Sequence, residues 1–442
     1  MTNPNVGDFN SSVKTNANED NKSLKNPRTT QTTLEGKTTW DFLRSFSVKE
    51  SHEYTHGLHI YPAKIVPQIA RGLVTQLSNP SDTVLDPFCG SGTVLVESLM
   101  ANRNSIGIDI NTLALLLAKV KTTPLPREEI IKTMRFVLKH AEEKARNELD
   151  PSQKTALEKI PNVYHWFQPY VAKYLAILRS EISNIIDRKI QDFFHVCFSA
   201  TMYDVSNIRR TDNPYFIRIL HMEEMAKHKP NVLEHFASIV KRNSKAVESI
   251  RKSQKDNVWV RTCKINTQYL ASRIGRETVD LIVTSPPYGE EKNTMDYARF
   301  SKLALYWLGL DGQHVKEMKN EALGSNLRRW EDNGLISKTL REKLPEIAYK
   351  SSRRADEVYS FFFDYTACLR AMFDVLKQDS YCCIVIGDRT ASGVPIPNGK
   401  ITSELCEAIG YATTERLERK MYMRTLRSNV IGSENILIMK RA

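Results

Sequence analysis

The sequence of 442 residues lacks any apolar run of about 18 residues or more, the length that a membrane-spanning helix needs. Its first residues, MTNPNVGDFNSSVK, are polar and contain no apolar segment of the kind found in secretory signal peptides. These two absences favour a protein that stays in the cytoplasm and does not enter a membrane.

Cysteine is also scarce. The seven cysteines form no CxxC pair and no Cys/His cluster with the spacing of zinc ligands, so we expect no metal site. An odd number of scattered cysteines is typical of reduced thiols in a reducing compartment, which agrees with a cytoplasmic location.

Acidic residues are outnumbered. There are 63 Lys and Arg against 51 Asp and Glu, which gives a formal net charge of +12. A basic surface attracts polyanions, so the composition favours a nucleic-acid partner.

Large apolar residues are almost missing from residues 1–38, and such a composition predicts a disordered tail. Order is expected to begin near Trp40 and Phe42.

Short apolar runs that end in polar or turn residues predict the buried parallel strands of a sheet. The first two runs flank GTVLVESLMANR, whose apolar residues have helical spacing, and this makes a βαβ unit. The sequence therefore predicts a doubly wound, Rossmann-like α/β sheet. The four runs are TVLDPF (83–88), SIGIDI (105–110), VDLIVTS (279–285) and YCCIVIGD (381–388), and a fifth, ENILIMK (434–440), is expected to form a terminal edge strand.

The segment 126–255 is expected to be a helical insertion in that sheet. Apolar residues at 171, 175, 178, 182 and 185 fall on one helix face, a stripe typical of packing. Asp86 and Ser285 are 199 positions apart, and about 90 residues would suffice for the strands between them, which leaves roughly 100 for the insertion. The expected division is therefore 39–125 and 256–442 for the two parts of the main domain, with 126–255 between them.

A glycine loop lies in VLDPFCGSGTVLVES (84–98), between a predicted strand and a predicted helix. Asp86 closes the strand, and Gly90 and Gly92 allow the backbone to approach a ligand closely at a helix N-terminus. Asp109, at the end of the next strand, is placed to accept hydrogen bonds from ribose hydroxyls. The third glycine of a dinucleotide fingerprint is absent, since position 95 is Leu, and this argues against NAD.

A second motif follows the apolar run 279–285, where the chain turns through Ser285, Pro286, Pro287 and Tyr288. Prolines fix φ and remove N–H donors, so their carbonyl oxygens are left to accept hydrogen bonds. The Ser285 hydroxyl can donate or accept, and the Tyr288 ring offers a flat stacking surface. Such a corner suits a flat group that carries an amino nitrogen.

Together these motifs resemble those of the DNA amino-methyltransferases. Phe88, Gly90 and Gly92 match the FxGxG loop for S-adenosylmethionine, TSPPY resembles the catalytic motif of the cytosine-N4 type, and HGLHIYPAKIVPQIA (56–70) resembles the segment beside the methionine end of the cofactor. The resemblance covers about residues 40–125 and 256–442.

The resemblance implies a site-specific enzyme that methylates N4 of a cytosine flipped out of double-stranded DNA. Ser285, Pro286, Pro287 and Tyr288 would hold the base and its amino group for direct transfer. None of the cysteines follows a proline, which argues against a covalent cytosine-C5 mechanism. Such enzymes usually act beside a restriction endonuclease with the same target site. The cofactor residues that the resemblance implies are Asp86, Phe88, Gly90, Gly92, Asp109, Asn266 and Lys64.

Some positions depart from the family pattern or leave alternatives open. Similar enzymes have Gly-Asp where Ile265-Asn266 stands. Lys64 is expected either to face the cofactor's carboxylate or the DNA, or to be an exposed lysine without a role. Adenine-N6 methylation, a tRNA guanine-N2 methyltransferase and an inactive DNA-binding module are the alternative functions. Target recognition is expected in the helical insertion or in one of three basic segments, which are 324–334, the stretch with Arg353 and Arg354, and 419–431.

Overall fold

The computed structural model describes residues 50–62, 64–209, 218–253, 257–289, 297–310, 312–330, 337–420 and 433–442. The predicted tail 1–38 and the expected start of order at Trp40 and Phe42 lie outside these residues. Most of the basic segment 419–431 lies outside them as well.

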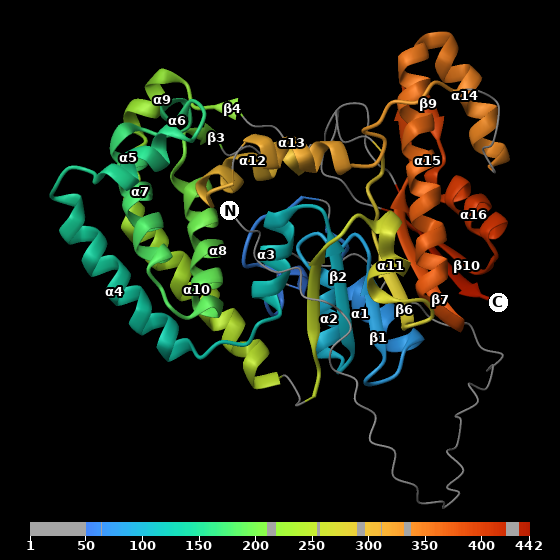
Figure 1. Cartoon of the computed structure of the whole chain (residues 1–442), viewed down its shortest axis with the longest axis horizontal. Helices are drawn as coiled ribbons and strands as arrows, with labels where there is room; N and C mark the ends of the chain where they lie inside the picture. The colour runs from blue at the N-terminus through green and yellow to red at the C-terminus, as the bar shows by residue number, and fades with distance from the viewer. Residues whose placement is uncertain are drawn as a thin grey trace, which may run out of the picture.

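A single large sheet has the strand order β10-β11-β7-β6-β1-β2-β5 in the part of the chain that the structure describes (Figure 1). The strands β5, β2, β1, β6 and β7 are parallel, and β11 is antiparallel to both of its neighbours. The doubly wound prediction is therefore confirmed. The strands are β1 (Thr83–Asp86), β2 (Asn104–Asp109), β5 (Val260–Lys264), β6 (Val279–Thr284), β7 (Leu376–Gly387), β10 (Tyr411–Lys420) and β11 (Ser433–Arg441).

The prediction that 434–440 forms the edge strand is wrong. β10 pairs along the outer side of β11 and takes the edge. The sequence of β10, YATTERLERK, is charged and polar along most of its length, so it carries no apolar run. Charged residues are typical of edge strands because they discourage further pairing, and this explains why an apolar pattern could not reveal β10.

The winding direction of the sheet reverses between β1 and β6. From β1 the chain proceeds to β2 and then β5 on one side, whereas β6 and β7 lie on the other side of β1. Loops that leave the carboxyl ends of β1 and β6 therefore diverge and leave a crevice between them. The glycine loop follows β1 and the Ser-Pro-Pro-Tyr corner follows β6, so both predicted motifs lie at this switch point.

Alternate residues of the central strands face two different cores, because both faces of the sheet are covered. Val84, Leu281 and Val283 pack on one face with α1 (Pro67–Leu77). Leu85 and Ile282 face the other core, to which α15 (Ser352–Val375) contributes. The remaining elements of this part are η2 (Glu50–His52), α2 (Thr93–Met100), α3 (Thr112–Lys121), η3 (Thr267–Tyr269), α11 (Leu270–Ile274), α12 (Tyr297–Trp307), α13 (Gly312–Glu321), α14 (Lys338–Lys350), β8 (Arg389–Ala391), β9 (Val394–Ile396) and α16 (Asn398–Ile409).

Helices make up most of the described residues between 126 and 253, which confirms the helical character predicted there (Figure 1). Val171, Leu175, Leu178 and Ile182 are fully buried in their core. None of the helices in the described ranges combines the length and apolarity that a membrane span requires. The elements are α4 (Arg127–Ala145), α5 (Pro151–Glu158), α6 (Val163–Trp166), α7 (Pro169–Ser183), α8 (Arg188–Val205), a short hairpin of β3 (Ile208–Arg209) and β4 (Arg218–Ile219), α9 (Met222–Lys227) and α10 (Val232–Ser253).

The helical segment is tied to the rest of the chain through Trp307 at the end of α12. The indole is fully buried and lies edge-on to Phe167 and Phe198, with ring centroids 5.7 Å away in both cases. Phe167 and Phe198 belong to the helical segment, whereas α12 follows the corner. The core of the helical segment is therefore continuous with the part of the chain that follows the corner.

We expect Trp307→Ala to lower the free energy of unfolding by about 3–5 kcal/mol, because it leaves a large cavity in this shared core. Phe136→Ala is the control, since that ring is 58% exposed, and it should change stability by no more than about 0.5 kcal/mol. Urea denaturation followed by circular dichroism measures both. Equal stabilities of the two variants would show that Trp307 does not link the two parts.

Candidate active site

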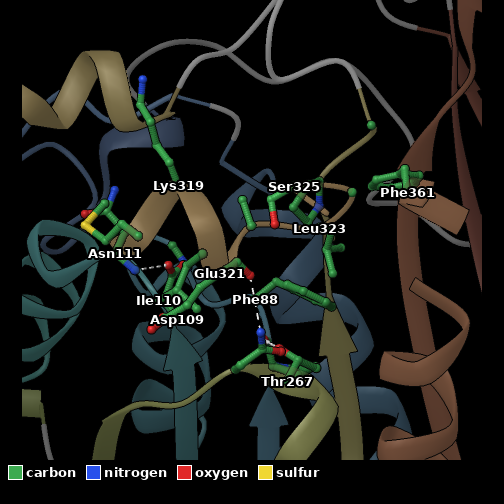
Figure 2. Close-up of a pocket in the computed structure, with 18 of the residues that line it drawn as sticks. Phe88, Asp109, Ile110, Asn111, Thr267, Lys319, Glu321, Leu323, Ser325 and Phe361 are labelled. Carbon is green, nitrogen blue, oxygen red and sulfur yellow. Dashed lines mark hydrogen bonds between the residues drawn. The ribbon is translucent and has the colours of Figure 1, made fainter. Parts of the chain in front are cut away.

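A cavity of about 290 Å³ opens at the switch point of the sheet. Its wall comes from the loop after β1, the end of β2, the start of η3 and the corner after β6. The end of α13 with its following turn and one face of α15 complete it. Figure 2 shows Asp109 and Asn111 on one side of this cavity and Phe361 on the other. The two predicted motifs therefore open into one space.

The glycine loop needs glycine for two different reasons. Gly90 has φ +47°, lines the cavity and donates its N–H to Asp109 Oδ2 at 2.9 Å. Gly92 has φ +81°, and a Cβ there would lie 2.8 Å from the Cα of Ala118 in α3. Since L-residues rarely adopt such φ values and the backbone of α3 cannot move aside, both positions favour glycine. Gly90 forms the cavity wall, while Gly92 lets α2 pack against α3.

Asp109 ends β2 and lines the cavity. Its Oδ1 accepts from the Asn111 N–H at 2.8 Å, and its Oδ2 accepts from the Gly90 N–H. Burial raises the pKa of this carboxyl to about 6, although the backbone donors oppose the shift. At neutral pH Asp109 is therefore largely ionised and can accept further hydrogen bonds from a ligand in the cavity.

Asp86 ends β1 but lies beneath the glycine loop, outside the cavity wall that the described residues form. Its side chain is 3% exposed and accepts from Thr284 Oγ1 at 2.7 Å and from the Phe88 N–H at 3.2 Å. Burial raises the pKa of the Asp86 carboxyl to about 7. The geometry makes Asp86 the link between the carboxyl ends of β1 and β6.

The corner contributes Ser285, Pro287 and Gly289 to the cavity wall, and Pro286 is buried behind them. Tyr288 is half-buried, and its ring packs against the core under α15. Its hydroxyl donates to Glu434 Oε1 at 3.4 Å and lies 3.5 Å from Ser285 Oγ. Burial raises the pKa of the Tyr288 phenol, so it stays protonated at neutral pH.

The other predicted residues lie at different distances from the cavity. Phe88 and Asn266 line it. The amide of Asn266 donates to the Glu321 carbonyl at 3.2 Å and also caps η3. Lys64 lies away from the described cavity wall and donates to the His56 carbonyl at 3.3 Å, and burial lowers its pKa.

Sequence reasoning missed the wall residues between 318 and 323, together with Glu357 and Phe361 of α15. It named Ser325 and Arg354 only as parts of basic segments for target recognition, without placing them at this cavity. The turn depends on Gly324, which has φ +73° and packs against the backbone of Phe361. The glycine was visible in the sequence, but nothing in its spacing from the two motifs indicated a shared cavity. Of the predicted basic segments, Arg328 pairs with Asp364 at 3.0 Å and lies over the Phe363 ring.

The raised pKa of Asp86 gives a pH prediction. In the unfolded chain the Asp86 carboxyl has a pKa of about 4, whereas in the folded protein its pKa is about 7. The contribution of Asp86 to the free energy of unfolding is therefore largest below about pH 4 and is lost as the pH rises to about 7. Asp86→Asn keeps an oxygen for Thr284 but cannot ionise. We therefore expect the melting temperature of the variant, relative to the unmodified protein, to rise between pH 5 and about pH 8. A difference that stays constant over this range in thermal unfolding would contradict the assignment.

Comparisons with known proteins identify the family of this chain. A sequence model of the family described as DNA methylase matches residues 4–119. The Type II methyltransferase M.MvaI of Kocuria varians is 32% identical over 374 residues, which are 80% of this chain and 81% of that protein. The Type II methyltransferase M.BsoBI of Geobacillus stearothermophilus is 23% identical over 411 residues, 80% of this chain and 78% of that protein.

Among solved structures, the rRNA methyltransferase aviRa from Streptomyces viridochromogenes aligns with 92% of this chain over 94% of the length of aviRa. The sequence identity is 13% and the TM-score is 0.29. A similarity this low supports no conclusion. The match to M.MvaI, in contrast, spans most of both chains. The chain therefore belongs to the DNA methylase family that includes the Type II methyltransferases, and its methyl donor is S-adenosylmethionine.

Proposed function

We propose that this DNA methyltransferase methylates N4 of a cytosine that is flipped out of double-stranded DNA. The single observation that carries the proposal is that Phe88 and Gly90 of the glycine loop and Ser285 and Pro287 of the corner line one cavity. One side of that cavity suits a nucleoside and the other suits a flat base with an amino group. We further propose that a restriction endonuclease with the same target site is the partner enzyme.

The cofactor half of the cavity has the donors and acceptors that S-adenosylmethionine requires. Asp109 offers carboxylate oxygens for the ribose hydroxyls, Phe88 offers a ring face, and Gly90 lets the backbone approach closely. Asn266 lines the wall where the adenine would lie. When bound, the cofactor supplies an electrophilic methyl group. Asp86, Gly92 and Lys64 would act indirectly, because they lie outside the described wall.

The corner would orient the target amino group. Ser285 Oγ and the carbonyl oxygens of the two prolines can accept its hydrogens, so that the nitrogen lone pair points toward the cofactor side. Positioning of this kind can lower a barrier by several kcal/mol without a covalent intermediate. Tyr288 lies between the wall residues Pro287 and Gly289 but is not itself part of the described wall, so it would support the base by stacking only from the edge of the cavity. Such a contact is worth roughly 1–3 kcal/mol in comparable cases.

The choice of cytosine depends on Ser285 at the first position of the corner. Family members that act on adenine tend to have Asp or Asn there, and those that act on cytosine tend to have Ser. Adenine-N6 methylation is thus the nearest alternative.

We also propose that residues 126–255 recognise the target sequence. This segment lies in the sequence between the two proposed catalytic parts, 39–125 and 256–442. The net charge of +12 suits DNA as a partner.

The product of the reaction tests the choice of base. We expect N4-methylcytosine when the protein is incubated with unmethylated bacterial DNA and labelled S-adenosylmethionine, and nucleoside mass spectrometry measures it. N6-methyladenine as the sole product would overturn the cytosine assignment. A parallel incubation contains RNA in place of DNA. Label transferred to the RNA and not to the DNA would overturn DNA as the substrate.

The cofactor role of Asp109 predicts that Asp109→Ala weakens the binding of S-adenosylmethionine about 10- to 100-fold, because a charged acceptor is lost. Isothermal titration calorimetry measures the affinity. Glu148→Ala is the control, since that carboxylate is 93% exposed on its side chain and distant from the wall. Unchanged affinity in Asp109→Ala would exclude the ribose contact.

The proposed stacking role of Tyr288 predicts that Tyr288→Ala loses turnover but keeps its affinity for the cofactor, the opposite of Asp109→Ala. Turnover should fall at least about 10-fold, because the base loses its stacking surface, while cofactor affinity stays within about twofold. A methyl-transfer assay and calorimetry on the same preparation separate the two effects. Loss of cofactor binding in this variant would show that Tyr288 supports the cofactor half of the cavity instead.

A further inference from the structure

One face of α15 lines the cavity and has no role in the function proposed above. Arg354, Glu357 and Phe361 are three and four positions apart, so they lie on the same face of the helix. All three belong to the cavity wall. A ligand in the cavity could therefore contact a charged pair and an aromatic ring on this face.

This face adjoins the corner. A Cβ at Gly289, the residue after Tyr288, would lie 2.9 Å from the Phe361 ring. Figure 2 shows Phe361 on the side of the cavity away from Asp109. The side chains of the α15 face therefore belong with the proposed base site and not with the ribose site.

Several other donors in the wall already have acceptors within the protein. Asn266 Nδ2 donates to the Glu321 carbonyl, Thr267 Oγ1 to the Pro87 carbonyl at 2.7 Å, and Ser325 Oγ to the Asn320 carbonyl at 2.5 Å. Lys319 lies toward Asn111 in Figure 2, on the cofactor side. Arg354 also has an acceptor within the protein, Glu357, and it is the arginine of the described wall, on the helix that adjoins the corner.

Glu357 fixes the guanidinium of Arg354. Arg354 Nη1 lies 2.9 Å from Glu357 Oε2, and the arginine side chain is 14% exposed. The neighbouring Arg353 contacts the other oxygen of Glu357 at 3.5 Å, but it is 80% exposed and lies outside the described wall. One carboxylate therefore holds two arginines, of which Arg354 faces the cavity.

The edge of the base suits this donor. Beside its amino group cytosine carries two adjacent acceptors, N3 and O2, whereas adenine carries N1 followed by a C–H group. A guanidinium presents parallel N–H donors that match two adjacent acceptors. We propose that Arg354, oriented by Glu357, donates to N3 and O2 of the flipped cytosine and thereby selects cytosine over adenine. This rests on the proposed function, since it assumes that the corner holds the amino group.

The test compares Arg354→Met with Arg353→Met. Both substitutions keep an aliphatic stem and remove a guanidinium that contacts Glu357, so they differ in access to the cavity. The substrate is a DNA duplex that contains the methylation site mapped with the unmodified enzyme. A second duplex carries adenine in place of the target cytosine.

We expect kcat/KM for the cytosine duplex to fall about 10- to 100-fold in Arg354→Met and to stay within about twofold in Arg353→Met. Cofactor affinity and melting temperature should stay close to those of the unmodified enzyme in both variants. The preference for the cytosine duplex over the adenine duplex should shrink by a similar factor in Arg354→Met alone. Glu357→Gln, which weakens the hold on Arg354 but leaves the donor, should give an intermediate loss.

Equal activities of the two Met variants would overturn the inference. A loss in Arg354→Met accompanied by an equal loss of cofactor affinity or of melting temperature would also overturn it, because it would show a structural role. These outcomes are separate from a failure of the proposed function, which would appear as a product other than N4-methylcytosine in the unmodified enzyme.

Discussion

The hydrogen bond from Thr284 to Asp86 joins the two strand ends between which the candidate active site opens. Thr284 directly precedes the corner, and Asp86 directly precedes the glycine loop. Because both side chains are buried, the bond is shielded from water and fixes the separation of the two motifs. If this contact shifted, the glycine-loop side and the corner side of the cavity would no longer face each other at a constant distance.

Two carboxylates at the same sheet edge have different tasks because their surroundings differ. Asp86 is enclosed, and its carboxylate accepts hydrogen bonds from the Thr284 hydroxyl and the Phe88 N–H. Burial raises the pKa of this carboxyl to about 7. Asp109 is held by two backbone N–H groups and faces the cavity, with a pKa of about 6. A ligand can therefore reach Asp109 only. The family identity agrees with this division, since a nucleoside cofactor needs one accessible carboxylate at the second strand.

The parts that carried a strong local pattern could be predicted from the sequence. The apolar runs that became β1, β2, β6 and β7 are buried on both faces, and the strand-glycine-helix context identified the loop. The edge strand β10 could not be predicted, because its charged residues are selected by solvent exposure and not by burial. The place of α13 and α15 in the wall could not be predicted either, although Arg354 was named within a basic segment. These residues lie far from both motifs in the sequence, and the packing of Gly324 and Gly289 on Phe361 holds α15 beside the cavity.

We propose that one cavity at the switch point holds both the cofactor and the target base. The most direct measurement is a crystal structure with S-adenosylhomocysteine and a duplex that contains the mapped methylation site. We expect the ribose hydroxyls at Asp109, the sulfur directed toward Ser285, and the flipped base between the corner and the α15 face. A cofactor product bound away from the glycine loop, or a flipped base that does not contact residues 285–288, would contradict the claim.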